Sequence, residues 1–177
     1  YTQKNPFDIF NKNFGILILN YEDNMKILLE YAFEDRLKQN IFYTQFQYSA
    51  YKVYRESKPQ KSVKEQFEII KGIINKIKTD EKYKDIYFDF ILDIPRSNPE
   101  DINDHKQYTL DSYVDDIIEM GNSEDYKYLV RGIGIGGRNE RYTMGGNYKN
   151  SFDTIKNSDN VIIIPHAGEF GNKDIMC

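Results

Sequence analysis

Helix-like and strand-like patterns alternate along this chain, and this alternation restricts its fold more than any other feature. Apolar side chains recur at a spacing near 3.6 in two segments and more weakly in two others, which predicts helices over residues 24–40, 63–77, 110–120 and 148–156. Short runs rich in aromatic and β-branched residues predict strands over 41–50, 86–94, 129–137 and 161–164. Asp23 or Asn24 is suited to begin the helix at 24–40, and Ser62 is suited to begin the helix at 63–77. Gly121 is suited to end the helix at 110–120.

This order favours right-handed crossovers and a parallel sheet covered by helices, which is the α/β class. No repeat or linker divides the chain, so we expect one domain over residues 1–177. Functional residues of parallel α/β folds gather where the strands end. Those ends fall at residues 47–50, 93–97, 134–139 and 166–169, and we expect them along one rim of the sheet.

Composition excludes several classes of protein. With 40% hydrophobic and 15% aromatic residues over 177 positions, the chain has enough apolar surface to bury a core. The net charge of −4 gives no electrostatic reason to expect a nucleic-acid partner. The single cysteine, Cys177, excludes an internal disulfide, and no segment is typical of a membrane span or a signal peptide. We therefore expect a soluble, cytoplasmic protein.

The glycine-rich run GIGIGG, residues 132–137, has two interpretations. Gly132, Gly134 and Gly137 satisfy the G-x-G-x-x-G pattern of dinucleotide-binding loops, but that interpretation requires a helix that begins at the last glycines. The residues that follow are polar, contain further glycines and lack a helical period, and the glycines themselves fall inside the predicted strand. We favour a strand end without side chains, against which a flat ligand can lie.

The run VIIIPHAGEF, residues 161–170, ends a buried strand in a histidine and a glutamate. A histidine at a strand end is more often structural than a ligand. His166, however, follows an aliphatic run at the rim, and Glu169 lies three residues further on, past Gly168. Metal-assisted hydrolysis can use a histidine that ligates zinc and, close to it, a carboxylate that is not itself a ligand. One histidine cannot hold zinc alone, so at least two further ligands would be needed.

Taken together, these motifs resemble the adenosine deaminase family of zinc-dependent (β/α)8-barrel purine deaminases. Residues 165–169, PHAGE, are similar to the family's fifth-strand element, and GIGIGG with Glu140 behind it is similar to the fourth-strand element. More loosely, YTQFQYSA at 43–50 resembles the second strand, residues 91–96 the third strand that ends in arginine, and NPFDIFNKNF at 5–14 the segment before the second strand. The resemblance covers nearly the whole chain in order.

The resemblance implies that the chain is the segment of a TIM-type barrel from about strand 2 to strand 5. It also implies roles for individual residues: His166 as a zinc ligand, Glu169 as the acid that protonates the purine ring, and Gly136 and Gly137 as substrate-binding residues. The backbone N–H of Gly137 would donate to a ring nitrogen. The implied reaction converts adenosine or an adenine nucleotide to its inosine form with release of ammonia. The expected partners are that small molecule and further copies of the chain, and neither a membrane nor a nucleic acid.

Two departures from the family pattern indicate a divergent branch, such as the deaminases of phage-defence or CRISPR systems. Gln45 and Gln47 stand where the family has Glu and Arg, and Gly134 stands where many members have Asp. The family's first-strand His-x-His, sixth-strand His and eighth-strand aspartates have no counterpart here, and a complete barrel needs about 250 residues. We therefore expect a fragment of a longer protein that is inactive alone. The alternative is a deaminase-like domain without activity that serves assembly or ligand sensing.

Overall fold

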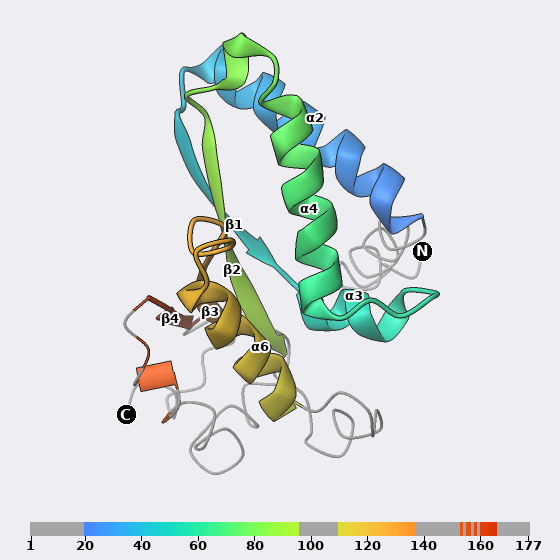
Figure 1. The fold of residues 1–177 in the computed structure, drawn as a ribbon, viewed down its shortest axis with the longest axis vertical. Coiled ribbons are helices and arrows are strands. Elements are labelled where there is room, and N and C mark those ends of the chain that lie inside the picture. The colour runs from blue at the N-terminus through green and yellow to red at the C-terminus, as the bar shows by residue number, and fades with distance from the viewer. Residues whose placement is uncertain are drawn as a thin grey trace, which may run out of the picture. The chain divides into compact units, whose positions relative to one another are not determined.

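The structure, a computed structural model, describes residues 20–95, 110–136, 153, 155–156, 158 and 160–165 (Figure 1). Its elements follow the chain as α2 (Tyr21–Gln39), β1 (Tyr43–Tyr48), α3 (Ala50–Glu56), α4 (Val63–Ile77), η1 (Glu81–Tyr83), β2 (Tyr87–Pro95), α6 (Leu110–Asn122), β3 (Val130–Gly136) and β4 (Ile162–Pro165). Of the predicted helix at 148–156, residues 153, 155 and 156 are helical and the remainder lies outside the described residues.

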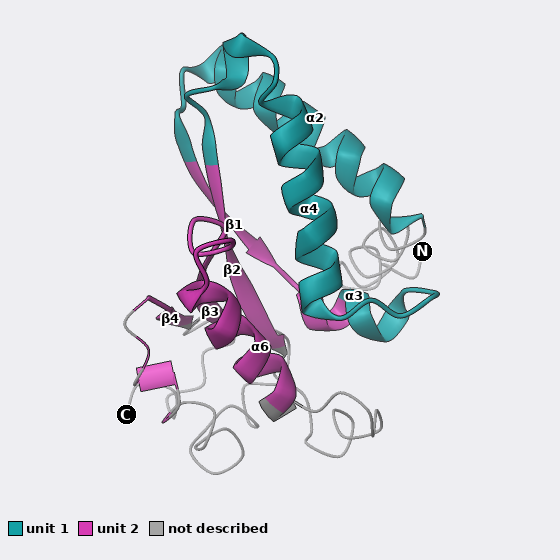
Figure 2. Cartoon of the chain, in the orientation of Figure 1, with its two compact units in different colours: residues 1–43, 53–87 teal, residues 44–52, 88–177 magenta. Residues whose placement is uncertain are grey.

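Two compact units make up the chain (Figure 2). The first comprises Tyr1–Tyr43 and Val53–Tyr87 and contains α2, α4 and η1. The second comprises Thr44–Lys52 and Phe88–Cys177 and contains α6 and the four strands, except that the first residues of β1 and β2, Tyr43 and Tyr87, belong to the first unit. The strand-end rim predicted from the sequence therefore belongs to the second unit.

Helix α2 begins earlier than its apolar pattern predicted. Its N-cap is Asn20 rather than Asp23 or Asn24, and Asn20 has the left-handed backbone (φ 53°) that asparagine tolerates better than most residues. The helix buries Leu29 and Phe33. Ile27 and Tyr31 are 62% and 71% exposed. Apolar residues thus lie on both sides of α2, which blurs the periodicity from which its start was predicted.

Helix α4 forms as predicted, from Val63 to Ile77. The hydroxyl of its N-cap, Ser62, accepts from the backbone N–H of Glu65 (3.3 Å), while the Glu65 carboxylate accepts from the backbone N–H of Ser62 (2.7 Å). This reciprocal pair satisfies two donors that the first turn would otherwise leave open. Four apolar residues at helical spacing become the buried face, namely Val63, Phe67, Ile70 and Ile74.

The second unit is built on a four-stranded sheet in the order β1-β2-β3-β4. The pairs β2–β3 and β3–β4 are parallel, and α6 connects β2 to β3 as a crossover helix. The α/β class with a parallel sheet and flanking helices, predicted from the sequence, is confirmed at this level. Strand β1 is shorter than predicted, because helix α3 already begins at Ala50.

One face of the sheet carries its apolar core. Phe46 of β1 stacks on Phe88 of β2, with ring centroids 5.1 Å apart, and Leu92, Ile94 and Ile133 on the same face are fully or almost fully buried. Helix α6 packs against β3 and buries Tyr113, Val114, Ile117 and Met120. These contacts join the crossover helix to the strands that it connects.

The prediction that Gly121 ends α6 is wrong, because the helix continues to Asn122. A Cβ atom on Gly121 would overlap the Val161 side chain and lie 3.5 Å from the Val130 carbonyl oxygen. Gly121 is therefore explained by the close approach of α6 to the strands rather than by a helix-ending conformation. None of the helices within the described ranges combines the length and apolar character of a membrane span.

Replacing Ser62 by alanine tests the account of α4. The variant Ser62→Ala loses the hydroxyl of the capping pair, and we expect the free energy of unfolding to fall by about 1 kcal/mol. Urea denaturation measures this change, and Asn75→Ala on the exposed part of the same helix is the control, with an expected change within about 0.5 kcal/mol. Equal stability of the Ser62→Ala variant and the wild type would contradict the role of the cap.

Candidate functional site

Three neighbouring strands end together at one edge of the sheet. In the parallel register Pro95 of β2 lies beside Gly136 of β3, and Ile135 of β3 lies beside Pro165 of β4. The chain therefore leaves β2, β3 and β4 at the same edge, which is where parallel α/β folds place their sites. The rim predicted from the sequence is present for these three strands.

The residues predicted to form the site are only partly within the described structure. Gly136 is the last residue of β3. Gly137, His166 and Glu169 lie outside the described residues. Gly137 and His166 directly follow the last residues of β3 and β4 in the chain, so the fold brings their immediate predecessors, Gly136 and Pro165, to neighbouring strand ends.

The glycines of β3 lie inside the strand, as predicted, but the structure gives a different reason for two of them. A Cβ atom on Gly132 would lie 2.7 Å from the backbone oxygen of Ile162 and 3.0 Å from the Ile91 side chain. A Cβ atom on Gly134 would overlap Oδ1 of Asp93. The Ile162 backbone fills the space beside Gly132, so close packing within the sheet requires that glycine whether or not a flat ligand binds, whereas the Asp93 side chain fills the space beside Gly134.

Asp93 belongs to the strand end 93–97 that was expected from the sequence on the rim, but it was given no role of its own there. It lies two residues before the end of β2, on the face that also carries Ile91, Gly132 and Gly134, and its side chain is half-buried. Its carboxylate leans across the strand boundary over Gly134. The signal in the sequence was a charged residue within the apolar run IYFDFILDI, since acidic residues are seldom buried without a structural or functional role.

Tyr113 of α6 holds the end of β2 in place. Its ring is fully buried, its Oη donates to the backbone carbonyl of Asp93 (3.2 Å), and its ring meets that of Tyr51 edge-on at 5.3 Å. Burial raises the pKa of the Tyr113 phenol well above its ordinary value, and the negative charge of Asp93 raises it further. The phenol therefore stays protonated and keeps its donor at neutral pH.

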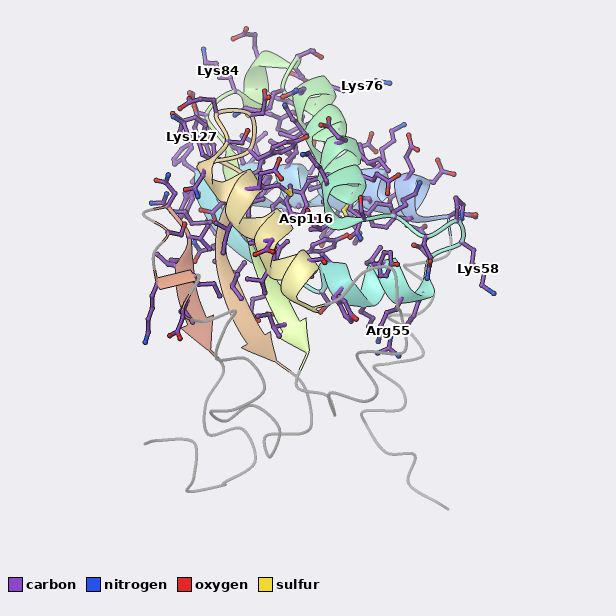
Figure 3. The ribbon with its side chains drawn as sticks, turned by 60° about the horizontal axis from the view of Figure 1, so that its bottom comes forward. Arg55, Lys58, Lys76, Lys84, Asp116 and Lys127 are labelled. Carbon is purple, nitrogen blue, oxygen red and sulfur yellow. The ribbon has the colours of Figure 1, made fainter. Side chains whose placement is uncertain are left out.

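Several charged side chains at the surface form ion pairs. Lys84 lies 3.3 Å from a Glu81 oxygen, and Lys127 lies 2.7 Å from a Glu124 oxygen, and Figure 3 shows both lysines at the outside of the molecule. Exposed pairs of this kind contribute little to stability. The sequence-based expectation that nucleic acid is not a partner stays a prediction.

Zinc binding is not accounted for by the described residues. They contain no group of three histidine, cysteine, aspartate or glutamate side chains close enough to hold a metal ion. His166, the zinc ligand expected from the sequence, lies outside the described ranges. Comparison of the chain with known protein families found no matching family model, and comparison with curated proteins found no match either.

The same substitution at two glycines should have opposite effects. Gly132→Ala forces a methyl group against the Ile162 backbone oxygen, and we expect it to destabilise the protein by about 1–3 kcal/mol. Gly72→Ala in the exposed middle of α4 meets no atom within 4 Å and should stabilise by about 0.5–1 kcal/mol through helix propensity. Urea denaturation of both variants measures the difference. A Gly132→Ala variant as stable as the wild type would contradict the close packing of β3 and β4.

Proposed function

We propose that this chain is part of a zinc-dependent hydrolytic deaminase that converts adenosine or an adenine nucleotide to the inosine form and ammonia. The observation that carries the proposal is the shared edge of β3 and β4. These adjacent parallel strands end in register, GIGIGG occupies the last part of β3, and PHAGE begins at Pro165, the last residue of β4. Two motifs about thirty residues apart in the chain are thereby directed to one rim, where α/β enzymes build their sites.

Each residue of the proposed site has a separate task. The Glu169 carboxyl donates a proton to a purine ring nitrogen, which makes the neighbouring ring carbon electrophilic. The backbone N–H of Gly137 donates to another ring nitrogen, and Gly136 allows the substrate to approach the end of β3 closely. His166 would be one of the zinc ligands, and zinc bound there would lower the pKa of a water toward neutral pH.

The proposal requires ligands beyond His166. Zinc at a catalytic site takes three protein ligands and keeps one position for water or substrate. The family that the sequence resembles also has a His-x-His on the first strand, a histidine on the sixth and paired aspartates on the eighth, and the further ligands would come from among such residues. The active unit would thus be a longer protein or an assembly that supplies these residues.

The direct test is activity of the full-length protein. We expect purified protein with bound zinc to convert adenosine or ATP to the inosine form, measured by the change in ultraviolet absorbance and by release of ammonia. Glu169→Gln should lower kcat by about 10²- to 10⁴-fold because the ring loses its proton donor, while the zinc content stays unchanged. Glu124→Gln, a surface change at an exposed ion pair, is the matched control. Unchanged substrate and no bound zinc would refute the proposal, as would full activity of the Glu169→Gln variant.

A second candidate function is a deaminase-like domain that binds a ligand without converting it. Gln45 and Gln47 favour it, because β1 exposes two uncharged amides where the resembled family has an ion-pairing Glu and Arg. Binding of adenosine by the full-length, zinc-supplied protein without release of ammonia would support this alternative over the enzyme.

A further inference from the structure

A cavity of about 270 Å³ lies beside the first turn of helix α2. The described residues that line it come from two segments, residues 20–23 at the start of α2 and residues 57–59 with Lys61 in the loop after α3. Both segments belong to the first unit, whereas His166, Glu169 and the glycine-rich run belong to the second. The cavity therefore shares no residue with the proposed deaminase site.

The backbone at the start of α2 is arranged to accept an anion. Asn20, the N-cap, has the left-handed conformation (φ 53°, ψ 51°), and its side chain makes no cap hydrogen bond. A left-handed residue next to helical residues turns successive N–H groups toward one side, which creates an anion-binding concavity. The first N–H groups of a helix also lack carbonyl partners within the helix, and its N-terminus carries a partial positive charge. Many helices share these properties, so they do not by themselves identify a site.

The side chain of Ser57 gives an independent indication of a ligand. Ser57 lines the cavity and is only 4% exposed, and its Oγ has no hydrogen-bond partner in the described part of the chain. A buried hydroxyl without a partner is costly, and native structures usually supply one, which can be a bound water or ion. The Ser57 hydroxyl is therefore suited to bond a ligand atom that enters the cavity.

Two lysines line the same cavity from a loop that is held at both ends. Lys58 is exposed and Lys61 is half-buried. The backbone N–H of Ser57 donates to the carbonyl of Val53 (2.9 Å), and the side-chain amide of the buried Gln66 donates to the carbonyl of Lys61 (2.8 Å). These hydrogen bonds limit the movement of the loop. The two lysines thus add positive charge beside the N-terminus of α2.

Glu22 and Asp23 also line the cavity, and they restrict which anion can bind. Their negative charges offset the charges of Lys58 and Lys61, so a fully ionised anion gains little net attraction. An ionised carboxylate accepts hydrogen bonds and cannot donate them. The anion that suits this set of groups therefore keeps a proton, which it donates to one of the carboxylates. Phosphate keeps a proton near neutral pH, whereas sulfate is fully ionised.

We propose that the cavity binds a phosphate group that retains one proton. The N–H groups at the start of α2, the Ser57 hydroxyl and the two lysines donate to its unprotonated oxygens. Glu22 or Asp23 accepts a hydrogen bond from its O–H. The ligand is either free phosphate or a phosphate monoester, and the monoester loses its last proton above about pH 6. This inference does not rest on the deaminase activity, because no residue of that site takes part.

Thermal unfolding and calorimetry of the full-length protein test the site with two similar ions. A ligand that binds only the folded state raises Tm. At neutral pH and constant ionic strength, we expect phosphate to raise Tm and sulfate to have a smaller effect. Lys58→Gln combined with Lys61→Gln should weaken phosphate binding about 10- to 100-fold. Lys84→Gln, at an exposed ion pair outside the cavity, is the control and should bind phosphate as the wild type does.

Two further variants separate binding from folding. Ser57→Ala removes a hydroxyl without a partner, so we expect Tm without phosphate to stay unchanged or rise while phosphate binding weakens. Glu22→Gln combined with Asp23→Asn removes the acceptors of the phosphate proton, and we expect sulfate then to bind as tightly as phosphate. A purely structural role of these residues would change Tm equally with and without phosphate and would leave the preference for phosphate intact.

Glycerol 3-phosphate identifies the source of the phosphate group. Binding of this ester below about pH 6, as tight as that of free phosphate, indicates a phosphorylated ligand whose remainder extends to solvent. Binding of free phosphate alone indicates that the ion itself is the ligand. The proposal is overturned if the wild-type protein binds phosphate no better than sulfate, or if the lysine and serine variants bind phosphate as tightly as the wild type.

Discussion

The close packing of β3 between its neighbours is the constraint on which the rest of the second unit depends. Gly132 lies so near the backbone of Ile162 that a methyl group cannot fit, and Gly134 leaves the space into which Asp93 leans. A larger side chain at position 132 would push β4 away from β3 and disturb the register that brings their ends together. The glycine-rich run therefore helps to determine where the strands end. Its last described residue, Gly136, ends β3, directly before Gly137, whose backbone N–H is the proposed contact to the substrate.

The sequence predicted those elements whose local signals agree with their packing. Helix α4 has a capping serine, a strong apolar face and no competing pattern, and its bounds were predicted correctly. Predictions failed where tertiary packing replaces a local signal. Gly121 has the character of a helix end but allows α6 to approach Val161, and α3 begins at Ala50 inside a run whose aromatic content is typical of a strand. The start of α2 was missed because apolar residues lie on both sides of the helix.

The candidate site was predictable in its location and only in part in its members. Four strand ends could be read along the chain, and the parallel pairing of three of them follows from the alternation of helices and strands. The pairing of Asp93 with Gly134 was not predictable, because it depends on the register between strands whose paired residues are about forty positions apart in the chain. Tyr113 was missed for a similar reason: its hydrogen bond to Asp93 becomes visible only when α6 is placed on the sheet.

The central claim is that the ends of β3 and β4 direct His166 and the glycine-rich run to one metal-dependent site. The most direct measurement is a crystal structure of the full-length protein grown with zinc, with diffraction data collected on both sides of the zinc absorption edge. The account predicts an anomalous peak about 2.0–2.1 Å from a ring nitrogen of His166, beside the carboxyl ends of β3 and β4. A zinc peak bound elsewhere, or a His166 ring turned away from that edge in zinc-saturated crystals, would contradict it.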